Sequence, residues 1–221
     1  EEELERLRNT DETTEQLEKD LDAEEKALIE AATELSTKRK IEGKKLSKEI
    51  QSILKGLALE KAVFECGFKE IAPNSTGMDE IEFLFSANKG EEPKSLQKVA
   101  SGGELSRIML AIKTVLRGVD KIPTLVFDEV DAGIGGKTAQ NVATRLKESS
   151  SEKQVLCITH LPQIAAVADT HMLIEKSDKG NTVVVIVREL KEKQREEEIA
   201  RMLGGDVTST SLKHARELLK A

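Results

Sequence analysis

One short stretch of the chain combines a helix-capping residue with two consecutive glycines, a pattern that can bind an anion. Ser101 and Glu104 have the S-x-x-E spacing of a capping box, in which hydroxyl and carboxylate each accept a hydrogen bond from the other's backbone N–H. Gly102 and Gly103 would let a ligand approach the free N–H groups at a helix N-terminus, which attract phosphate. This segment alone supports a plain helix cap and an anion site equally.

A second segment ends an apolar run with two carboxylates, Asp128 and Glu129. Continuous apolar runs such as residues 122–127 are typical of buried parallel strands, whose ligands bind beyond the carboxyl ends. Because adjacent strand residues point to opposite sides, one carboxylate can face a hydrated Mg²⁺ and the other an attacking water. That division suits phosphoryl transfer, although a pair of solvated acids is the alternative.

A third apolar segment, residues 154–159, ends in His160. A single histidine at a strand end is more often structural than catalytic. However, Ser101 precedes Asp128 by 27 residues and Glu129 precedes His160 by 31 residues, each about one strand-helix unit. We therefore expect these side chains at the loop side of one sheet.

Gly133–Thr138 matches the phosphate-binding loop of P-loop NTPases only in part. The pattern G-x-x-x-x-G-K-[ST] needs a glycine at position 131, where the chain has Asp131. No other Gly-Lys-Ser/Thr occurs in the sequence. We interpret the segment as a turn that opens the next helix, so the main phosphate cradle is absent from this sequence.

The elements that must position these residues begin with a long helix over residues 1–58. Its apolar residues follow the heptad spacing of a coiled-coil seam, first at Leu17, Leu21, Leu28, Ala31 and Leu35 and then at Leu46, Ile50, Ile53 and Leu57. The second set starts 11 residues after Leu35, an insertion of four that should locally unwind the supercoil. A solvated single helix packed on its own domain is the alternative.

The rest of the chain predicts an α/β domain with a mixed, largely parallel sheet and flanking helices, because strands alternate with helices. Two antiparallel strands are expected at 62–68 and 81–85, followed by helices at 102–117 and 136–147 and strands at 124–127 and 154–159. Further strands near 172–175 and 183–187 precede helices near 196–203 and 210–219.

Composition excludes several classes of protein. The net charge is −7, and aromatic residues make up 2% with no Trp or Tyr, which argues against a base-stacking surface. The chain lacks both a basic leader and an apolar run of 18 residues, so we expect a soluble intracellular protein with no membrane partner. Cys66 and Cys157 lack metal or redox spacing, and we expect both to be small buried hydrophobic residues.

Together these segments resemble ABC-type ATPases. Ser101–Glu104 resembles the signature motif, Thr124–Glu129 the Walker B strand, Val130–Gly133 the D-loop and Thr159–His160 the switch histidine. A long coiled coil entering such a domain is similar to the SMC-like branch, and the longer stretches around these motifs resemble its bacterial DNA-repair members.

The resemblance implies that residues 1–58 are a coiled-coil arm and residues 59–221 the C-terminal half of an ATPase head. The Walker A loop and Q-loop would come from an N-terminal half, so this chain alone should not hydrolyse ATP. The start at Glu1 without Met favours a shortened chain. By position, Asp128 would hold Mg²⁺ through water, Glu129 would polarise the attacking water and His160 would contact the γ-phosphate of ATP.

The same resemblance implies a homodimer with ATP sandwiched between two heads. The signature residues Ser101, Gly102, Gly103 and Glu104 would face the ATP of the opposing head, with Ser101 and Gly103 touching its γ-phosphate. Asp131 would communicate between the two heads across the dimer interface.

The expected setting is the bacterial cytoplasm, in association with the nucleoid, and the repair of DNA double-strand breaks. The basic clusters Lys38–Lys40 and Lys44–Lys45 could touch DNA, but charged helices are usually just solvated. The alternatives are a coiled-coil interaction module with vestigial carboxylates, another SMC-like ATPase domain, and a transporter nucleotide-binding domain, which the long coil disfavours.

Overall fold

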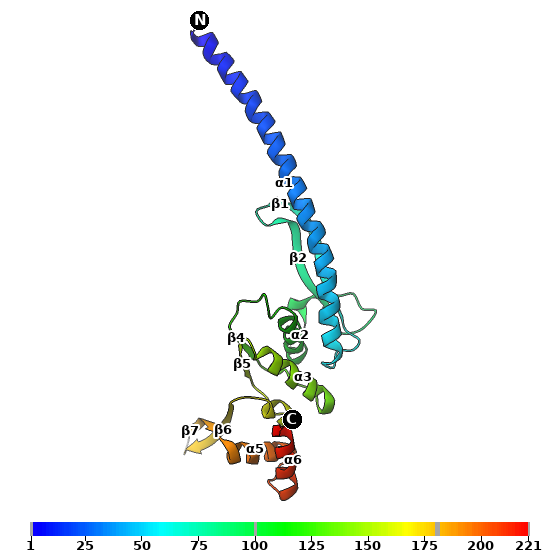
Figure 1. Ribbon diagram of the computed structural model, residues 1–221, viewed down its shortest axis with the longest axis vertical. Coiled ribbons are helices and arrows are strands. Elements are labelled where there is room, and N and C mark those ends of the chain that lie inside the picture. The colour runs from blue at the N-terminus through cyan, green and yellow to red at the C-terminus, as the bar shows by residue number, and fades with distance from the viewer. Residues whose placement is uncertain (1, 100, 180–181, 221) are drawn as a thin grey trace. The chain divides into compact units, whose positions relative to one another are not determined.

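The computed structural model describes residues 2–99, 101–179 and 182–220, and the side chains of 13–99, 101–177 and 182–220 within them. The elements follow in the order α1 (Glu2–Lys55), β1 (Val63–Asn74), β2 (Gly77–Ser86), β3 (Lys94–Ser95), the 3₁₀ turn η1 (Leu96–Lys98), α2 (Gly102–Val115), β4 (Thr124–Phe127), α3 (Gly136–Ser149), β5 (Gln154–Cys157), α4 (Pro162–Ala166), β6 (His171–Lys179), β7 (Thr182–Leu190), α5 (Glu192–Gly204) and α6 (Ser209–Lys220) (Figure 1). The chain forms two compact units, residues 1–48 with 64–84 and residues 49–63 with 85–221. The boundary expected after residue 58 separates the predicted coiled-coil arm from the predicted ATPase head. It was not a prediction of compact units, and it remains a prediction.

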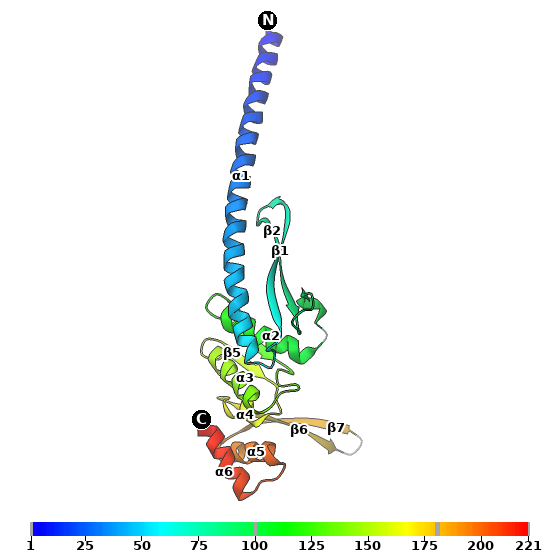
Figure 2. The ribbon, with the colours of Figure 1, turned by 90° about the vertical axis from the view of Figure 1, so that its right-hand side faces the viewer.

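In the first unit, the β1–β2 hairpin runs alongside α1 (Figure 2). The Asn74 side chain accepts a hydrogen bond from the Thr76 N–H at 2.8 Å, an Asx turn that reverses the chain within the predicted turn 73–77. Phe64 is buried, and its ring centroid lies 5.4 Å from that of Phe83.

Small residues on α1 let the hairpin approach the helix. Ser36 is buried and donates to Asp79 Oδ1 at 2.7 Å, and Ser47 Oγ accepts the Cys66 N–H at 3.0 Å. A Cβ at Gly43 would lie 2.8 Å from the Phe68 ring. The hairpin β1–β2 therefore packs against the face of α1 between residues 36 and 47. The four-residue insertion in the heptad spacing falls in the same stretch.

The part of the predicted coiled-coil seam that is N-terminal to this stretch is exposed in the single chain. The exposed fractions of Leu17, Leu21, Leu28 and Leu35 are 63%, 58%, 48% and 38%. The long helix is confirmed, whereas its pairing with another helix stays a prediction. At the other end of α1, in the second unit, Ile50 and Leu54 are fully buried, and Asn141 of α3 donates to the Gly56 carbonyl at 2.9 Å.

The second unit contains the parallel pair β4–β5, aligned from Thr124 opposite Gln154 to Phe127 opposite Cys157. Residues alternate between the two faces. Leu125 and Phe127 are buried on one face of β4, while Val126 is exposed on the other. Helices α2 and α3 contact each other and carry the buried side chains Ile108, Leu110, Ile112, Val142 and Leu146.

The expected α/β class with a long N-terminal helix is confirmed, but the expected mixed, largely parallel sheet does not form in the described part of the chain. There the strands form three separate sheets, of which only β4–β5 is parallel. The strands β6 and β7 pair antiparallel with each other, from His171 opposite Leu190 to Lys179 opposite Thr182. The alternation of strands and helices predicts connections, but it does not say which strand edges join.

The C-terminal helices share a small core built from Ala165, Ala166, Ile199, Ala200 and Ala215. The helix α4 and the short elements η1 and β3 were not expected, because segments of two to five residues give little periodic signal. Cys66 and Cys157 are free thiols, but both are partly exposed rather than fully buried as predicted.

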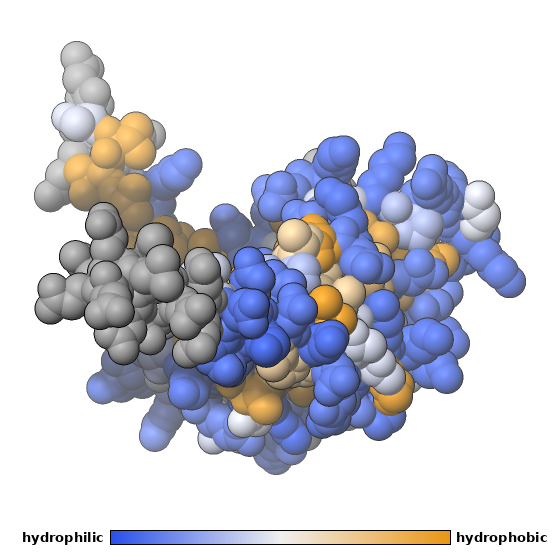
Figure 3. Space-filling view, turned by 90° about the horizontal axis from the view of Figure 1, so that it is seen from above, coloured by the Kyte–Doolittle hydropathy of each residue, from blue (hydrophilic) through white to orange (hydrophobic). Residues whose placement is uncertain are grey.

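Among the described helices, none is both long and apolar enough to cross a membrane. The face of the molecule seen in Figure 3 is mostly hydrophilic with scattered apolar residues, in keeping with the 34% of charged residues in the sequence.

Candidate active site

The helix α2 begins at the predicted anion-binding segment. Ser101 is its N-cap and accepts a hydrogen bond from the Glu104 N–H at 3.4 Å, which is one half of the predicted capping box. In the described part of the chain, the Glu104 carboxylate returns no bond to Ser101, and the N–H groups of Gly102 and Gly103 have no partner. Both donors are therefore free for an anion, as the second interpretation of this segment requires.

The two carboxylates follow β4 but do not continue it. The strand ends at Phe127, and Glu129 has a left-handed backbone with φ 56°, which is unfavourable for a residue with a Cβ. The sequence argument that Asp128 and Glu129 alternate across a strand is therefore wrong. A bend after the strand sets their directions instead, and both side chains are exposed.

Asp131 connects this bend to the end of β5. The residue is 3% exposed, and its carboxylate accepts hydrogen bonds from Thr159 Oγ1 at 2.5 Å and the His160 N–H at 2.9 Å. The His160 Nδ1 lies 3.1 Å from the same carboxylate oxygen, while the rest of the imidazole is exposed. This contact orients the ring and leaves Nε2 facing outward.

Two residues of α2 also bind the bend at residues 128–132. The sequence had given neither of them a role. Ser106 donates to the Asp128 carbonyl at 2.6 Å. The Arg107 Nη1 donates to the Ala132 carbonyl at 2.8 Å and lies 3.5 Å from the Val130 carbonyl. Arg107 is 6% exposed, and nothing in a local pattern distinguishes such a buried arginine from a solvated one.

The glycines of α2 permit a close approach to the bend. A Cβ at Gly102 would collide with the Glu129 carboxylate, and a Cβ at Gly103 would lie 2.8 Å from Ala132 Cβ and 3.1 Å from the Glu129 carbonyl. The N-terminus of α2, residues 128–132 and His160 thus form one connected cluster.

Burial and carboxylates set the electrostatics of this cluster. Burial lowers the pKa of Arg107, and the charge of Glu104 partly opposes that change. Burial, with Asp131 and Asp128 nearby, raises the pKa of Cys157 to about 12. Three carboxylates within four residues make this end of the β4–β5 pair a place that favours cations.

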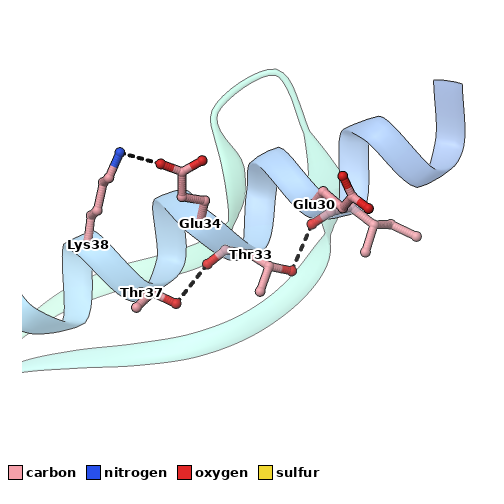
Figure 4. A pocket seen from close by; sticks show the side chains of 6 residues that line it. Glu30, Thr33, Glu34, Thr37 and Lys38 are labelled. Carbon is pink, nitrogen blue, oxygen red and sulfur yellow. Dashed lines mark hydrogen bonds and ion pairs between the residues drawn. The ribbon is translucent and has the colours of Figure 1, made fainter.

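A surface hollow elsewhere carries no comparable chemistry. It is lined by residues 29–38 of α1 alone, where the hydroxyls of Thr33 and Thr37 donate to carbonyls one turn back and Lys38 pairs with Glu34 (Figure 4). Its hydroxyls and its one ammonium group are paired, and it brings together no set of groups comparable to that around Asp131.

Comparison with known proteins gives the family. The model of the RecF/RecN/SMC N terminal domain matches residues 7–183. The chain belongs to the RecF/RecN/SMC family. Among relatives in this family, the DNA repair protein RecN of Bacillus subtilis is 43% identical and the alignment covers 100% of this chain and 41% of that protein. The DNA repair protein RecN of Treponema pallidum is also 43% identical, over 94% of this chain and 38% of that protein.

This member of the RecF/RecN/SMC family therefore spans about two fifths of the length of these curated relatives. A solved structure of the Smc head domain with a coiled coil and joint, from Pyrococcus yayanosii, is similar with a TM-score of 0.49 and 23% identity over 82% of this chain and 34% of that chain.

Proposed function

We propose that the chain is the C-terminal half of an ATPase head that acts in the repair of DNA double-strand breaks, with α1 as its coiled-coil arm. The observation that carries this proposal is the connected cluster of Ser101–Glu104, residues 128–132 and His160. These are the motif positions that this half of a head contributes in ABC-type ATPases. The sequence has no Walker A loop, which favours the C-terminal half.

The uncovered face of β4–β5 supports the same proposal. Val126, Leu156 and Ile158 are exposed by 64%, 51% and 56% on the face opposite Leu125 and Phe127. Parallel strands are normally covered on both faces. An N-terminal half carrying Walker A would supply the missing layer, and this chain alone would be inactive.

The residues fit the groups that ATP hydrolysis needs. The free N–H groups at the start of α2, where Gly103 has no room for a Cβ, would form a cradle for phosphate oxygens. No group of three metal-ligating side chains occurs in the described chain, and Mg²⁺ commonly uses only one or two carboxylates together with phosphate oxygens and waters. Asp128 would hold Mg²⁺ through water, and the bound ion would neutralise charge on the transferred phosphoryl group.

The remaining roles follow from geometry and charge. Glu129 would accept a proton from the attacking water, and His160 would contact the γ-phosphate through Nε2. The N-terminus of α2 would face the ATP of a second head, with Ser101, Gly103 and Asp131 near the dimer interface. Because these contacts exist only with ATP in place, hydrolysis would loosen the dimer.

The test is hydrolysis by the chain alone and mixed with the Walker A-bearing half of a relative such as the Bacillus subtilis RecN. We expect turnover only in the mixture. Glu129→Gln should lower the rate by about 10²-fold or more, the usual contribution of a general base, while an ATP-dependent dimer accumulates. Glu197→Gln, at an exposed position on α5, is the matched control and should leave the rate unchanged.

Two outcomes would contradict the proposal. Failure of the two halves to copurify would contradict the proposal that this chain is one half of an ATPase head. Copurification without turnover, or full turnover in the Glu129→Gln variant, would leave a coiled-coil interaction module with vestigial carboxylates.

A further inference from the structure

We infer that Arg107 is a positioning residue that sets the orientation of Asp131 and, through it, the tautomer of His160. The inference deepens the proposed function and rests on it for its catalytic meaning. It assigns a role to the helix residue itself, which touches neither nucleotide nor metal.

The first argument is where the guanidinium is anchored. Its Nη1 lies 2.8 Å from the Ala132 carbonyl and 3.5 Å from the Val130 carbonyl. These two carbonyls flank Asp131 in the chain. A donor that binds the peptide group before Asp131 and the one after Ala132 limits the backbone rotation of the two residues between them, and so restricts the direction of the Asp131 side chain.

The second argument is where that side chain then points. The Asp131 carboxylate is buried, and its Oδ2 atom contacts Thr159 Oγ1, the His160 N–H and His160 Nδ1. An imidazole with Nδ1 against a carboxylate carries a proton on Nδ1, so the Nδ1–H tautomer is favoured in the neutral ring and Nε2 is the nitrogen left to face the γ-phosphate. If the Asp131 carboxylate turned away from His160 Nδ1, the Nδ1–H tautomer would lose the acceptor that favours it.

The third argument is that the arrangement is not favoured by charge pairing. Arg107 is 6% exposed, and its hydrogen-bond partners in the described part of the chain are neutral carbonyls. Burial of an unpaired guanidinium is unfavourable, as the lowered pKa of Arg107 reflects. A buried methionine would fill similar space without that penalty, so the hydrogen bonds to the bend are what the arginine adds.

The fourth argument is that the bend packs closely against α2. Gly103 lies one helical turn before Arg107, and a Cβ there would meet the Ala132 Cβ and the Glu129 carbonyl. The start of α2 is therefore in close contact with the segment that holds Asp131. In the proposed dimer, this links the end of α2 that faces one nucleotide to the histidine that faces the other.

The experiment measures the tautomer of His160 in the nucleotide-free chain, from the imidazole ¹⁵N shifts at a pH where the ring is neutral. His160→Gln assigns the signal among the three histidines. We expect the Nδ1–H form to dominate in the wild type. Arg107→Met should lower the ratio of Nδ1–H to Nε2–H forms about fivefold, the effect of losing one ordinary hydrogen bond, and Arg107→Lys should restore part of it.

Arg195→Met is the matched control, because Arg195 also donates to backbone carbonyls, those of Ala165, Ala166 and Ala168. It should lower stability and leave the His160 tautomer unchanged. An unchanged ratio in Arg107→Met, or an equal change in Arg195→Met, would overturn the inference. Because no nucleotide is present, this result is independent of whether the mixed halves hydrolyse ATP.

Discussion

The two long hairpins of the chain have the same topology and opposite environments. The β1–β2 hairpin lies along α1 and is tied to it by Ser36, Ser47 and the close approach at Gly43. The β6–β7 hairpin has no such cover in the described chain. The apolar residues of β7 are exposed by 38–60%, and they are Val183, Val184, Val185, Ile186 and Val187.

This difference shows that an apolar run specifies a strand without specifying what covers it. A continuous apolar strand is expected to be buried on both faces. The β7 residues, like Val126 and Leu156 on the parallel pair, have no cover in the described chain. The covered hairpin instead completes its packing within its own unit.

The largest expected effect comes from truncating an apolar side chain in each hairpin. Phe64→Ala should lower the free energy of unfolding by about 3–4 kcal/mol, because Phe64 is 1% exposed and packs on Phe83. Ile186→Ala, at 44% exposure, should lower it by less than about 1 kcal/mol. Urea unfolding followed by circular dichroism measures both, and equal losses would remove the contrast between the hairpins.

A smaller effect is expected from the polar contact between the first hairpin and α1. Asp79→Ala leaves the Ser36 hydroxyl without its partner and removes the carboxylate 3.7 Å from Arg39. Because Arg39 is partly exposed, the loss should be about 2 kcal/mol, below that of a fully buried ion pair. Glu80→Ala is the control.

Glu80 is the next residue on β2, and its ion pair with Lys69 is exposed, so its removal should change the free energy of unfolding by about 0.5 kcal/mol or less. Hydrogen exchange of residues 63–86 should be faster in Asp79→Ala than in Glu80→Ala. Equal exchange in the two variants would mean that Asp79 does not hold the hairpin to the helix.

The smallest expected effect is a pH dependence at the base of β6–β7. Burial and, to a lesser extent, Arg195 lower the pKa of His171, while Glu198 opposes them. The unfolded chain then binds a proton more readily than the folded one as the pH falls below about 6.5, so stability should decrease on acidification. His171→Gln should reduce the fall in Tm between pH 7.5 and 5.5, whereas His214→Gln, at an exposed site on α6, should not. An unchanged fall in His171→Gln would contradict this origin.

The sequence by itself determined the local elements and the order of the motifs. The long helix, β4, β5, the Asx turn near Asn74 and the N-cap at Ser101 depend on periodicity, capping and turn chemistry, which act between residues close in the chain. The site candidates Ser101, Asp128, Glu129 and His160 were found for the same reason, because each stands where an element begins or ends.

Only the tertiary structure decided how these positions meet. The contacts of Arg107 with Ala132 and of Asp131 with His160 join residues 25 and 29 positions apart, and they depend on packing rather than on local pattern. The left-handed bend at Glu129, the separation of the strands into three described sheets and the choice of which hairpin is covered have the same origin. A local pattern states which residues are apolar or polar, and tertiary packing decides which of them become partners.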